Sequence, residues 1–253
     1  MTDNKSGCQA WNPDYYTMSF VDQTMNWSGE CKGGKIYGDG VLKFTMRFIR
    51  NPDDKLFSEE DIKDRTVSYF GVFENGICQH DCYVELFENN KKKGKYTGGM
   101  KNNLPHGKGI FLYTSGKKYV GGFINGYRNG KGEENNNFGR YIGDWKNDRK
   151  HGQGTMTYSD NDFYRDGRVS YTGSFVKGIE NGTGEMIFKD GKKYIGIFKH
   201  GHPQKSGTII YPNGDSYSGG ILNGIKHGTG TFTQKDGSAF QGWWRAGKLL
   251  EKQ

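Results

Sequence analysis

The stretch YSGGILNGIKHGTGTFTQKDGSAF, residues 217–240, contains in one period the pattern that decides the fold. It opens with an aromatic residue, a glycine and a large apolar residue at alternate positions in Tyr217-Ser-Gly-Gly-Ile221. A second glycine pattern follows in His227-Gly-Thr-Gly230, and the turn signal Asp236-Gly237 closes the unit. The next unit opens at Phe240, which makes the period 23 residues.

The same unit recurs through most of the chain. Residues 96–247 carry it almost without interruption, and residues 27–95 carry it in degraded form. Two steps between units exceed the period, and they predict insertions at residues 45–68 and 159–168. Within the first insertion, residues 57–64 are expected to form a short helical turn. The units open at Trp27, Tyr69, Tyr96, Tyr119, Tyr141, Tyr171, Tyr194, Tyr217 and Phe240.

Alternation within each unit predicts a β-hairpin. Tyr96, Gly98 and Met100 alternate on one expected strand, opposite glycines of its partner strand. A glycine opposite a large aromatic residue lets the ring lie flat over the backbone. Successive hairpins are expected to pair edge to edge, so the predicted fold is all-β, an elongated, twisted, single antiparallel sheet of tandem β-hairpins. The glycines expected to adopt a positive φ between the two strands of a hairpin are Gly126, Gly178, Gly201 and Gly224.

These repeated residues resemble the MORN (membrane occupation and recognition nexus) repeat, which opens Tyr-x-Gly-x-Trp and closes on spaced glycines. The resemblance implies the same architecture, often with a curved, aromatic-lined groove. It also implies precedent for peptide binding, self-association, and assembly at membranes or the cytoskeleton. The chain is accordingly divided into an N-terminal cap, degenerate repeats, regular repeats and a tail, at residues 1–26, 27–95, 96–247 and 248–253.

Composition agrees with a thin sheet. Of 253 residues, 41 are glycine and 15% are aromatic, whereas only 32% are hydrophobic. Residues 1–90 carry a net charge of −6 and residues 91–253 carry +14, so the basic body could attract an acidic partner. A solvated polar face of a repeat protein is the competing interpretation of this charge.

The sequence also predicts where in the cell the chain is found. It contains no apolar run of the ~18 residues that a membrane span needs, and no signal peptide is visible. The four cysteines are too few and too irregularly spaced for a disulfide framework. We therefore expect a cytoplasmic location, either free or peripheral to a membrane or the cytoskeleton. The cysteines are Cys8, Cys31, Cys78 and Cys82.

No pattern in the sequence predicts a catalytic residue, a bound cofactor or a metal site. Three histidines share one repeat offset with asparagine and glutamine residues, which indicates a turn hydrogen bond and not proton transfer. In Cys78-x-His80-x-Cys82, an extended strand would hold the cysteines ~13 Å apart, too far for one zinc ion. Asp160, Asp162 and Asp166 lack the terminal glutamate of a calcium loop. The histidines are His106, His151 and His227.

The preferred function is a non-enzymatic scaffold that binds a protein. A sheet surface lined with rings could hold an amphipathic helix or an extended peptide, and open edge strands could support a homodimer. The competing interpretation is that the rings only stabilise the sheet. The residues of this predicted partner groove are Tyr96, Tyr119, Phe123, Tyr141, Trp145, Tyr171, Phe175, Tyr194 and Phe198.

The alternative function is peripheral binding to an acidic phospholipid membrane through lysine-rich turns. Clustered lysines near an anionic surface contribute ~1 kcal/mol each. Ordinary solubility of turns is the competing explanation, because the lysines recur at the turn offset. Dispersed basic residues and the absence of a recognition motif disfavour nucleic acid. The lysines are Lys91, Lys92, Lys93, Lys95, Lys117, Lys118, Lys192 and Lys193.

Overall fold

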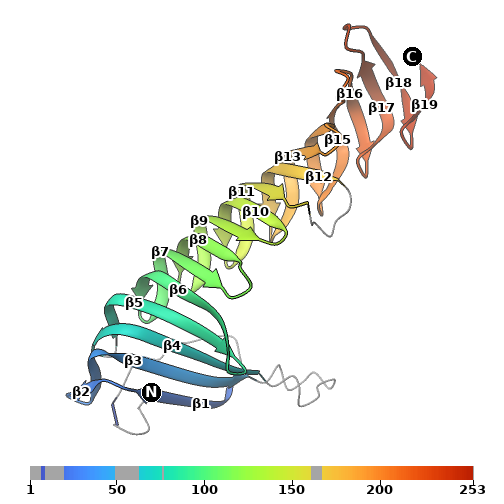
Figure 1. The fold of residues 1–253 in the computed structure, drawn as a ribbon. Helices are drawn as coiled ribbons and strands as arrows, with labels where there is room; N and C mark the ends of the chain where they lie inside the picture. Colours follow the sequence, from blue (N-terminus) through green and yellow to red (C-terminus); the bar gives the residue numbers. More distant parts are fainter. Residues whose placement is uncertain (1–6, 9–19, 49–62, 76, 161–166, 253) are drawn as a thin grey trace. The chain divides into compact units, whose positions relative to one another are not determined.

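The computed structural model describes residues 7–8, 20–48, 63–75, 77–160 and 167–252. Every helix or strand element within these ranges is a β-strand, so they include no helix that could cross a membrane. The chain divides into two compact units, Met1–Tyr127 and Arg128–Gln253. Each unit is built from consecutive antiparallel hairpins (Figure 1), which confirms the predicted fold class.

Unit 1 contains strands β1 to β8. From β3 onward each strand pairs with the next one along the chain, whereas β1 and the short β2 both pair with β3. The strands are β1 (Phe20–Trp27), β2 (Glu30–Lys32), β3 (Lys35–Phe48), β4 (Lys63–Glu74), β5 (Ile77–Glu88), β6 (Lys91–Lys101), β7 (Leu104–Tyr113) and β8 (Lys118–Ile124).

The structure corrects the predicted insertion at residues 45–68. Residues 45–48 continue β3 and residues 63–68 belong to β4, and the two segments pair from Thr45 opposite Thr66 to Phe48 opposite Lys63. The alternating sequence simply continues into longer strands, which the fixed period concealed. Most of the predicted helical turn lies outside the described residues, as do the aromatic residues Trp11, Tyr15 and Tyr16 of the predicted cap.

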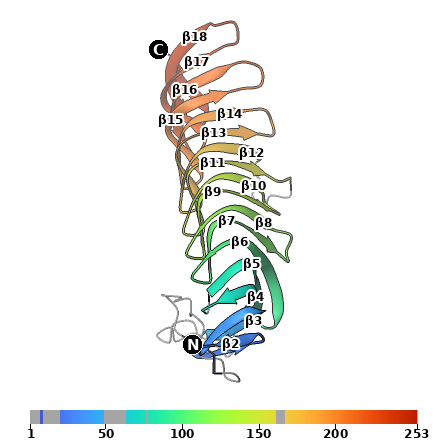
Figure 2. The same cartoon turned by 90° about the vertical axis from the view of Figure 1, so that its left-hand side faces the viewer.

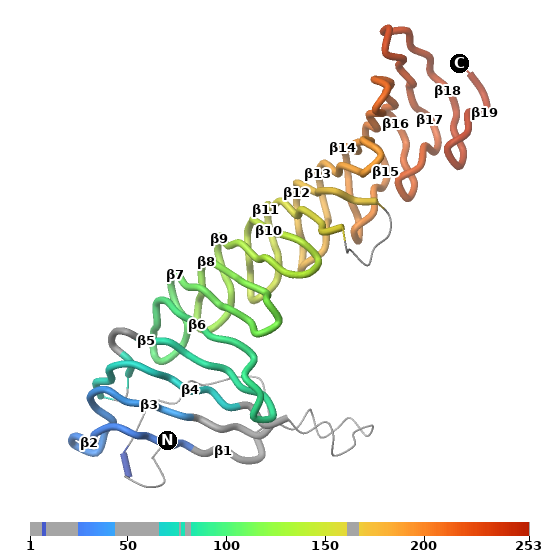
Figure 3. Tube along the Cα trace, viewed as in Figure 1, coloured from blue at the N-terminus to red at the C-terminus, as the bar shows by residue number. Residues whose placement is uncertain are grey.

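Unit 2 contains strands β9 to β19, each paired with the next, and Figure 3 traces the chain back and forth through them. The predicted tail forms the whole of β19 and covers the edge of β18. The strands are β9 (Tyr127–Asn136), β10 (Gly139–Lys146), β11 (Arg149–Tyr158), β12 (Arg168–Val176), β13 (Ile179–Phe188), β14 (Lys193–Lys199), β15 (His202–Ile210), β16 (Ser216–Leu222), β17 (Ile225–Thr233), β18 (Ala239–Arg245) and β19 (Lys248–Lys252).

In unit 2, two-residue turns join β10 to β11, β12 to β13, β14 to β15, β16 to β17 and β18 to β19. Both turn residues have positive φ, as in Asn223 (51°) and Gly224 (79°). This type I′ geometry matches the right-handed twist of the strands, so it favours asparagine followed by glycine. The predicted positive φ is confirmed at Gly126, Gly178, Gly201 and Gly224.

The glycines of unit 2 form a continuous row across the sheet. Each lies opposite a glycine of the neighbouring strand, as Gly143 lies opposite both Gly132 and Gly154. Figure 2 shows that the strands of unit 2 are curved. The row comprises Gly132, Gly143, Gly154, Gly173, Gly184, Gly196, Gly207, Gly219, Gly230 and Gly242.

Candidate functional site

The predicted aromatic groove is a packed ladder of rings. All nine predicted rings are between 0 and 4% exposed. Tyr141 and Tyr171 each lie edge-on to the aromatic residue four positions later and to its counterpart in the next repeat, as Tyr171 lies 5.2 Å from Phe175 and 4.8 Å from Phe198 between ring centroids. These T-shaped contacts are favourable for aromatic pairs. Within unit 1 and within unit 2, the structure therefore brings the rings together as a buried layer and not as an open groove.

Glycines on the neighbouring strand leave the space that the tyrosine rings occupy. A Cβ atom at Gly109 would lie 2.4 Å from the ring of Tyr96, and one at Gly184 would lie 2.5 Å from the ring of Tyr171. The rings thus lie against bare backbone, as the sequence predicted. Their role as a partner contact stays a prediction.

The tyrosine hydroxyls are satisfied inside the same layer. Each donates to the carbonyl oxygen three residues later, for example Tyr96 to Gly99 at 2.6 Å and Tyr141 to Asp144 at 2.9 Å. Burial raises the pKa of Tyr96 to about 12, and it also raises the pKa of Tyr141. These phenols therefore stay neutral donors at physiological pH, which suits structural bonds and not acid–base chemistry.

Basic side chains cover the ring layer in unit 2. The guanidinium of Arg128 lies 4.2 Å from the ring centroid of Trp145, and the ammonium of Lys226 lies 3.9 Å from that of Trp244. Burial lowers the pKa of Lys226. Cations held over ring faces are attracted by the aromatic quadrupole, so the aromatic face presents charge and not bare rings.

Arg128 also anchors an ion cluster that sequence reasoning missed. Its guanidinium pairs with the buried carboxylate of Glu134 and, at 3.0 Å, with Asp148 of the next hairpin turn. Asp148 also accepts the backbone N–H of Arg128 at 2.9 Å. Only the replacement of the usual turn glycine by Asp148 signalled this cluster in the sequence.

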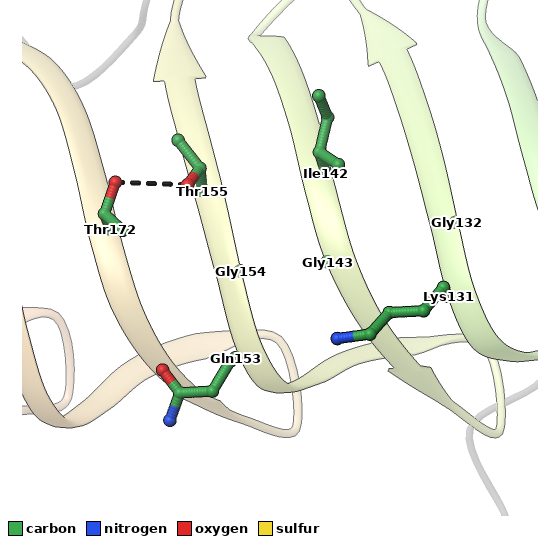
Figure 4. Close-up of a pocket in the computed structure, with 8 residues that line it drawn as sticks. All are labelled: Lys131, Gly132, Ile142, Gly143, Gln153, Gly154, Thr155 and Thr172. Atoms are coloured by element: carbon green, nitrogen blue, oxygen red, sulfur yellow. Dashed lines mark hydrogen bonds between the residues drawn. The ribbon is translucent and has the colours of Figure 1, made fainter.

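The opposite face of unit 2 carries a shallow, open pocket, called the channel below, whose lining residues are drawn in Figure 4. A cavity of about 530 Å³ has Gly132, Gly143 and Gly154 as its floor. Its walls combine the aliphatic side chain of Ile142, the hydroxyls of threonines and the polar ends of a lysine and a glutamine. This lining mixes apolar surface with a few hydrogen-bonding groups, as ligand pockets do. The remaining wall residues are Lys131, Gln153, Thr155 and Thr172.

Several of the predicted lipid-binding lysines already have partners. Lys92 pairs with Glu85 at 2.5 Å, Lys93 with Glu88 at 3.1 Å, and Lys192 with Asp190 at 4.0 Å. Lys95 and Lys117 lie over the rings of Tyr83 and Tyr113. Six of the eight lysines belong to unit 1, whereas Lys192 and Lys193 belong to unit 2. Carboxylates therefore pair with three of these eight lysines.

The prediction for the cysteines was wrong. Cys8 is disulfide-bonded to Cys31, and Cys78 to Cys82. The Cα atoms of Cys78 and Cys82 are 6.3 Å apart, not ~13 Å, because the β4–β5 pairing is bulged here and not regularly extended. The cysteines therefore give no support to a reducing, cytoplasmic environment.

No group of three metal-binding side chains occurs in the described ranges, which omit Asp162 and Asp166 of the calcium-like loop. The predicted turn hydrogen bond is present for two amides at the histidine offset. Asn129 donates to Asn147 at 3.3 Å, and Gln204 donates to Asn223 at 2.5 Å. By contrast, the Nδ1 atom of His106 is buried without a hydrogen-bond partner.

Comparison with known proteins agrees with the geometry. The MORN repeat model matches residues 96–118, 119–134, 141–163, 171–193, 194–216 and 217–239. Alsin from Mus musculus is 32% identical over 109 residues, which are 42% of this chain and 5% of alsin, and alsin from Homo sapiens gives the same values. An inactive protein tyrosine kinase, pTKL, from Plasmodium berghei (strain Anka) is 48% identical over 42 residues, 16% of this chain and 3% of that protein. The chain thus spans only a small part of these relatives.

Proposed function

The chain belongs to the MORN repeat family, and from this premise we propose that it is a non-enzymatic module that binds a protein segment. MORN repeats are membrane- or protein-binding modules, which supports this assignment. We propose that the buried ring ladder is the rigid frame of unit 2. The partner then lies along the channel on the opposite face.

The observation that carries the proposal is the channel of about 530 Å³ floored by Gly132, Gly143 and Gly154. Ile142 offers an apolar wall, and Thr155 and Thr172 offer hydroxyls, which are 3.1 Å apart. An extended peptide needs both apolar contact and hydrogen bonds, and this lining supplies both.

The rings of the predicted groove remain the alternative contact surface, because a partner could open the ladder. Self-association through either face is the remaining form of the same proposal.

To test this proposal, the proteins that bind to a channel variant are compared with those that bind to a variant of the ring face. The channel variant is Ile142→Glu/Thr155→Lys, and the ring variant is Tyr141→Ala/Trp145→Ala. Thr231→Lys is the matched control, because Thr231 continues the row of Thr155 outside the channel. Each variant is first checked for a native circular dichroism spectrum and thermal transition.

A partner that is lost only with the channel variant would support the proposed surface. Loss with the folded ring variant alone would move the contact to the aromatic face. Identical partners for all variants would contradict both surfaces. Size-exclusion chromatography with light scattering on the same proteins tests whether the partner is a second copy of the chain.

The second candidate function is peripheral binding to an anionic membrane through the lysine-rich turns. The basic balance of residues 91–253 favours it. The ion pairs of Lys92, Lys93 and Lys192 count against it. Sedimentation with acidic vesicles tests it, and a chain that stays in the supernatant at low salt contradicts it.

A further inference from the structure

The turn between β15 and β16, together with the neighbouring strand β17, lines another pocket in unit 2, which we call the turn pocket. Its volume is about 440 Å³, a size typical of small-molecule sites. It shares no lining residue with the channel. Its lining combines two aromatic rings, a proline, an amide and two groups of opposite charge. The lining residues are Tyr211, Pro212, Asn213, Asp215, Lys226 and Phe232.

One reversal of charge distinguishes this turn from the equivalent turn of the preceding repeat. There the N–H of Phe188 donates to the carbonyl of Lys192 at 2.9 Å, and the Lys192 ammonium lies 4.7 Å from the ring centroid of Phe188. The N–H of Tyr211 makes the same bond to the carbonyl of Asp215, at 2.9 Å. A carboxylate cannot cover a ring face by cation–π contact. The ring of Tyr211 therefore borders the pocket.

Hydrogen bonds hold the Asp215 carboxylate within its turn. Its Oδ1 atom accepts the backbone N–H of Lys235 at 3.0 Å, and its Oδ2 atom accepts the side-chain amide of Asn213 at 2.7 Å. The Oδ1 atom of Asn213 in turn accepts the N–H of Asp215 at 3.1 Å. The acid therefore fixes the shape of the turn at the edge of the pocket.

Lys226 supplies a cation that is surrounded by rings and pairs with no carboxylate of the described residues. Its Nζ atom lies 3.9 Å from the ring centroid of Trp244 and 5.1 Å from that of Phe232. The ring centroids of Tyr211 and Tyr217 are 5.9 Å and 5.8 Å away. Burial lowers the pKa of this ammonium, because the rings attract the cation but do not replace its hydrogen bonds with water. An anion that entered the pocket would supply a charged hydrogen-bond acceptor.

We propose that the turn pocket binds a small aromatic carboxylate, whose carboxylate pairs with the Lys226 ammonium and whose ring packs against Tyr211 and Phe232. The centroids of these two rings are 6.2 Å apart and their planes are inclined by 44°, so they form two apolar walls at an angle to each other. Aromatic ligands pack well against such inclined rings. The site lies outside the channel and the predicted partner groove, so it goes beyond the proposed protein-binding function.

The lining of the turn pocket selects for a ligand that carries both features. A simple anion would leave the rings without an apolar contact, and an uncharged aromatic molecule would leave the ammonium of Lys226 unpaired. A cationic aromatic molecule would be repelled by the same ammonium. The carboxylate of Asp215 disfavours ligands with several negative charges, so a single carboxylate fits better than a phosphate ester.

Titration of the isotope-labelled full chain with phenylacetate, followed by NMR, tests the proposal. Acetate lacks the ring of this probe, benzyl alcohol lacks its charge, and benzylamine reverses the charge. The variants are Lys226→Met and Lys226→Arg, each checked first for a native circular dichroism spectrum and thermal transition. Lys150→Met is the control, because Lys150 pairs with Trp145 as Lys226 pairs with Ile221 but lies outside the turn pocket.

We expect phenylacetate to shift the amide resonances of residues 211–215 and of Lys226. Lys226→Met should weaken its binding at least about tenfold, whereas Lys226→Arg and Lys150→Met should stay within about threefold of the wild type. Acetate, benzyl alcohol and benzylamine should each bind at least about tenfold more weakly than phenylacetate. No shift with phenylacetate, equal binding of acetate, or an equal loss with Lys150→Met would overturn the proposal.

A gain of affinity in a further variant could not result from poor folding. In Asp215→Asn, the asparagine can still accept the N–H of Lys235, but loss of the negative charge should tighten phenylacetate binding by about two- to tenfold. Weaker binding by this folded variant would contradict a carboxylate in the pocket.

Two further comparisons identify the source of the ligand and separate this test from that of the channel. A peptide that ends in phenylalanine carries the same ring and carboxylate, so tighter binding of this peptide than of phenylacetate would identify a chain end as the source. The channel variant Ile142→Glu/Thr155→Lys should bind phenylacetate as the wild type does, whether or not it retains its protein partner. Loss of phenylacetate binding in this folded variant would contradict the assignment of the ligand to the turn pocket.

Discussion

The ring of Tyr141 lies against Gly154 on the neighbouring strand so closely that a Cβ atom there would stand 2.4 Å from the phenol oxygen. The same relation recurs between Tyr96 and Gly109 in unit 1. A methyl group at this glycine must displace either the ring or the strand. The pairing of aromatic and glycine residues is therefore a steric requirement of the fold.

Gly154→Ala is expected to lower the free energy of unfolding by about 1–3 kcal/mol, the usual cost of overpacking. Gly154 does not have a positive φ, so the effect would come from the ring contact and not from backbone strain. Urea unfolding followed by tryptophan fluorescence measures it. Gly116→Asn is the control, because Gly116 has φ +86° and open space around it, and asparagine tolerates that conformation. Equal stability of Gly154→Ala and the wild type would contradict the steric argument.

The repeats could be predicted because each depends on local residues. Tyr217, Gly219 and Ile221 fix a strand face by alternation alone, and Asn223-Gly224 specifies the turn. The long β3–β4 pairing was missed because it departs from the period. The fixed period gave no reason to continue the strands through residues 45–48 and 63–68.

The candidate site was harder to predict than the fold. Burial of the rings depends on contacts between neighbouring repeats, as between Tyr171 and Phe198. The sequence of a single repeat does not reveal these contacts. The bond between Cys78 and Cys82 depends on an irregular strand pairing that alternation does not encode.

Arg128→Met is expected to destabilise the chain by about 3–5 kcal/mol, because it removes the guanidinium that balances the negative charge of the buried Glu134 carboxylate. The loss should exceed that of Arg140→Met, whose guanidinium pairs with Glu133 on the exposed face at 2.8 Å. Urea unfolding of both variants provides the comparison. Recovery of stability in Arg128→Met/Glu134→Gln would identify the unpaired charge as the cause. Similar losses for Arg128→Met and Arg140→Met would argue against it.

Lys177→Asn is expected to stabilise unit 2 by about 0.5–1 kcal/mol. Lys177 occupies the first position of a type I′ turn with φ 52°, where asparagine is favoured and lysine is strained. The equivalent position already holds asparagine at Asn223, so Asn223→Lys should destabilise by a similar amount. Thermal unfolding of the two variants should give shifts of opposite sign. Shifts of the same sign would show that other contacts, and not turn conformation, dominate.

The buried tyrosines predict a loss of stability at alkaline pH. Burial raises the pKa of Tyr96 from 10.0 to about 12, so the folded chain holds this proton more tightly than the unfolded chain. Below pH 10 both states are protonated and the contribution is fully present. Between pH 10 and about 12 the unfolded state deprotonates first, and the free energy of unfolding falls as pH rises. Tyr141 and Tyr171, whose pKa values are also raised by burial, add to the same fall.

Urea unfolding across this range, with ultraviolet absorbance of tyrosinate recorded in parallel, should show the buried phenols ionising together with unfolding. Ionisation of every tyrosine near pH 10 with the β-sheet circular dichroism intact would contradict the buried ladder.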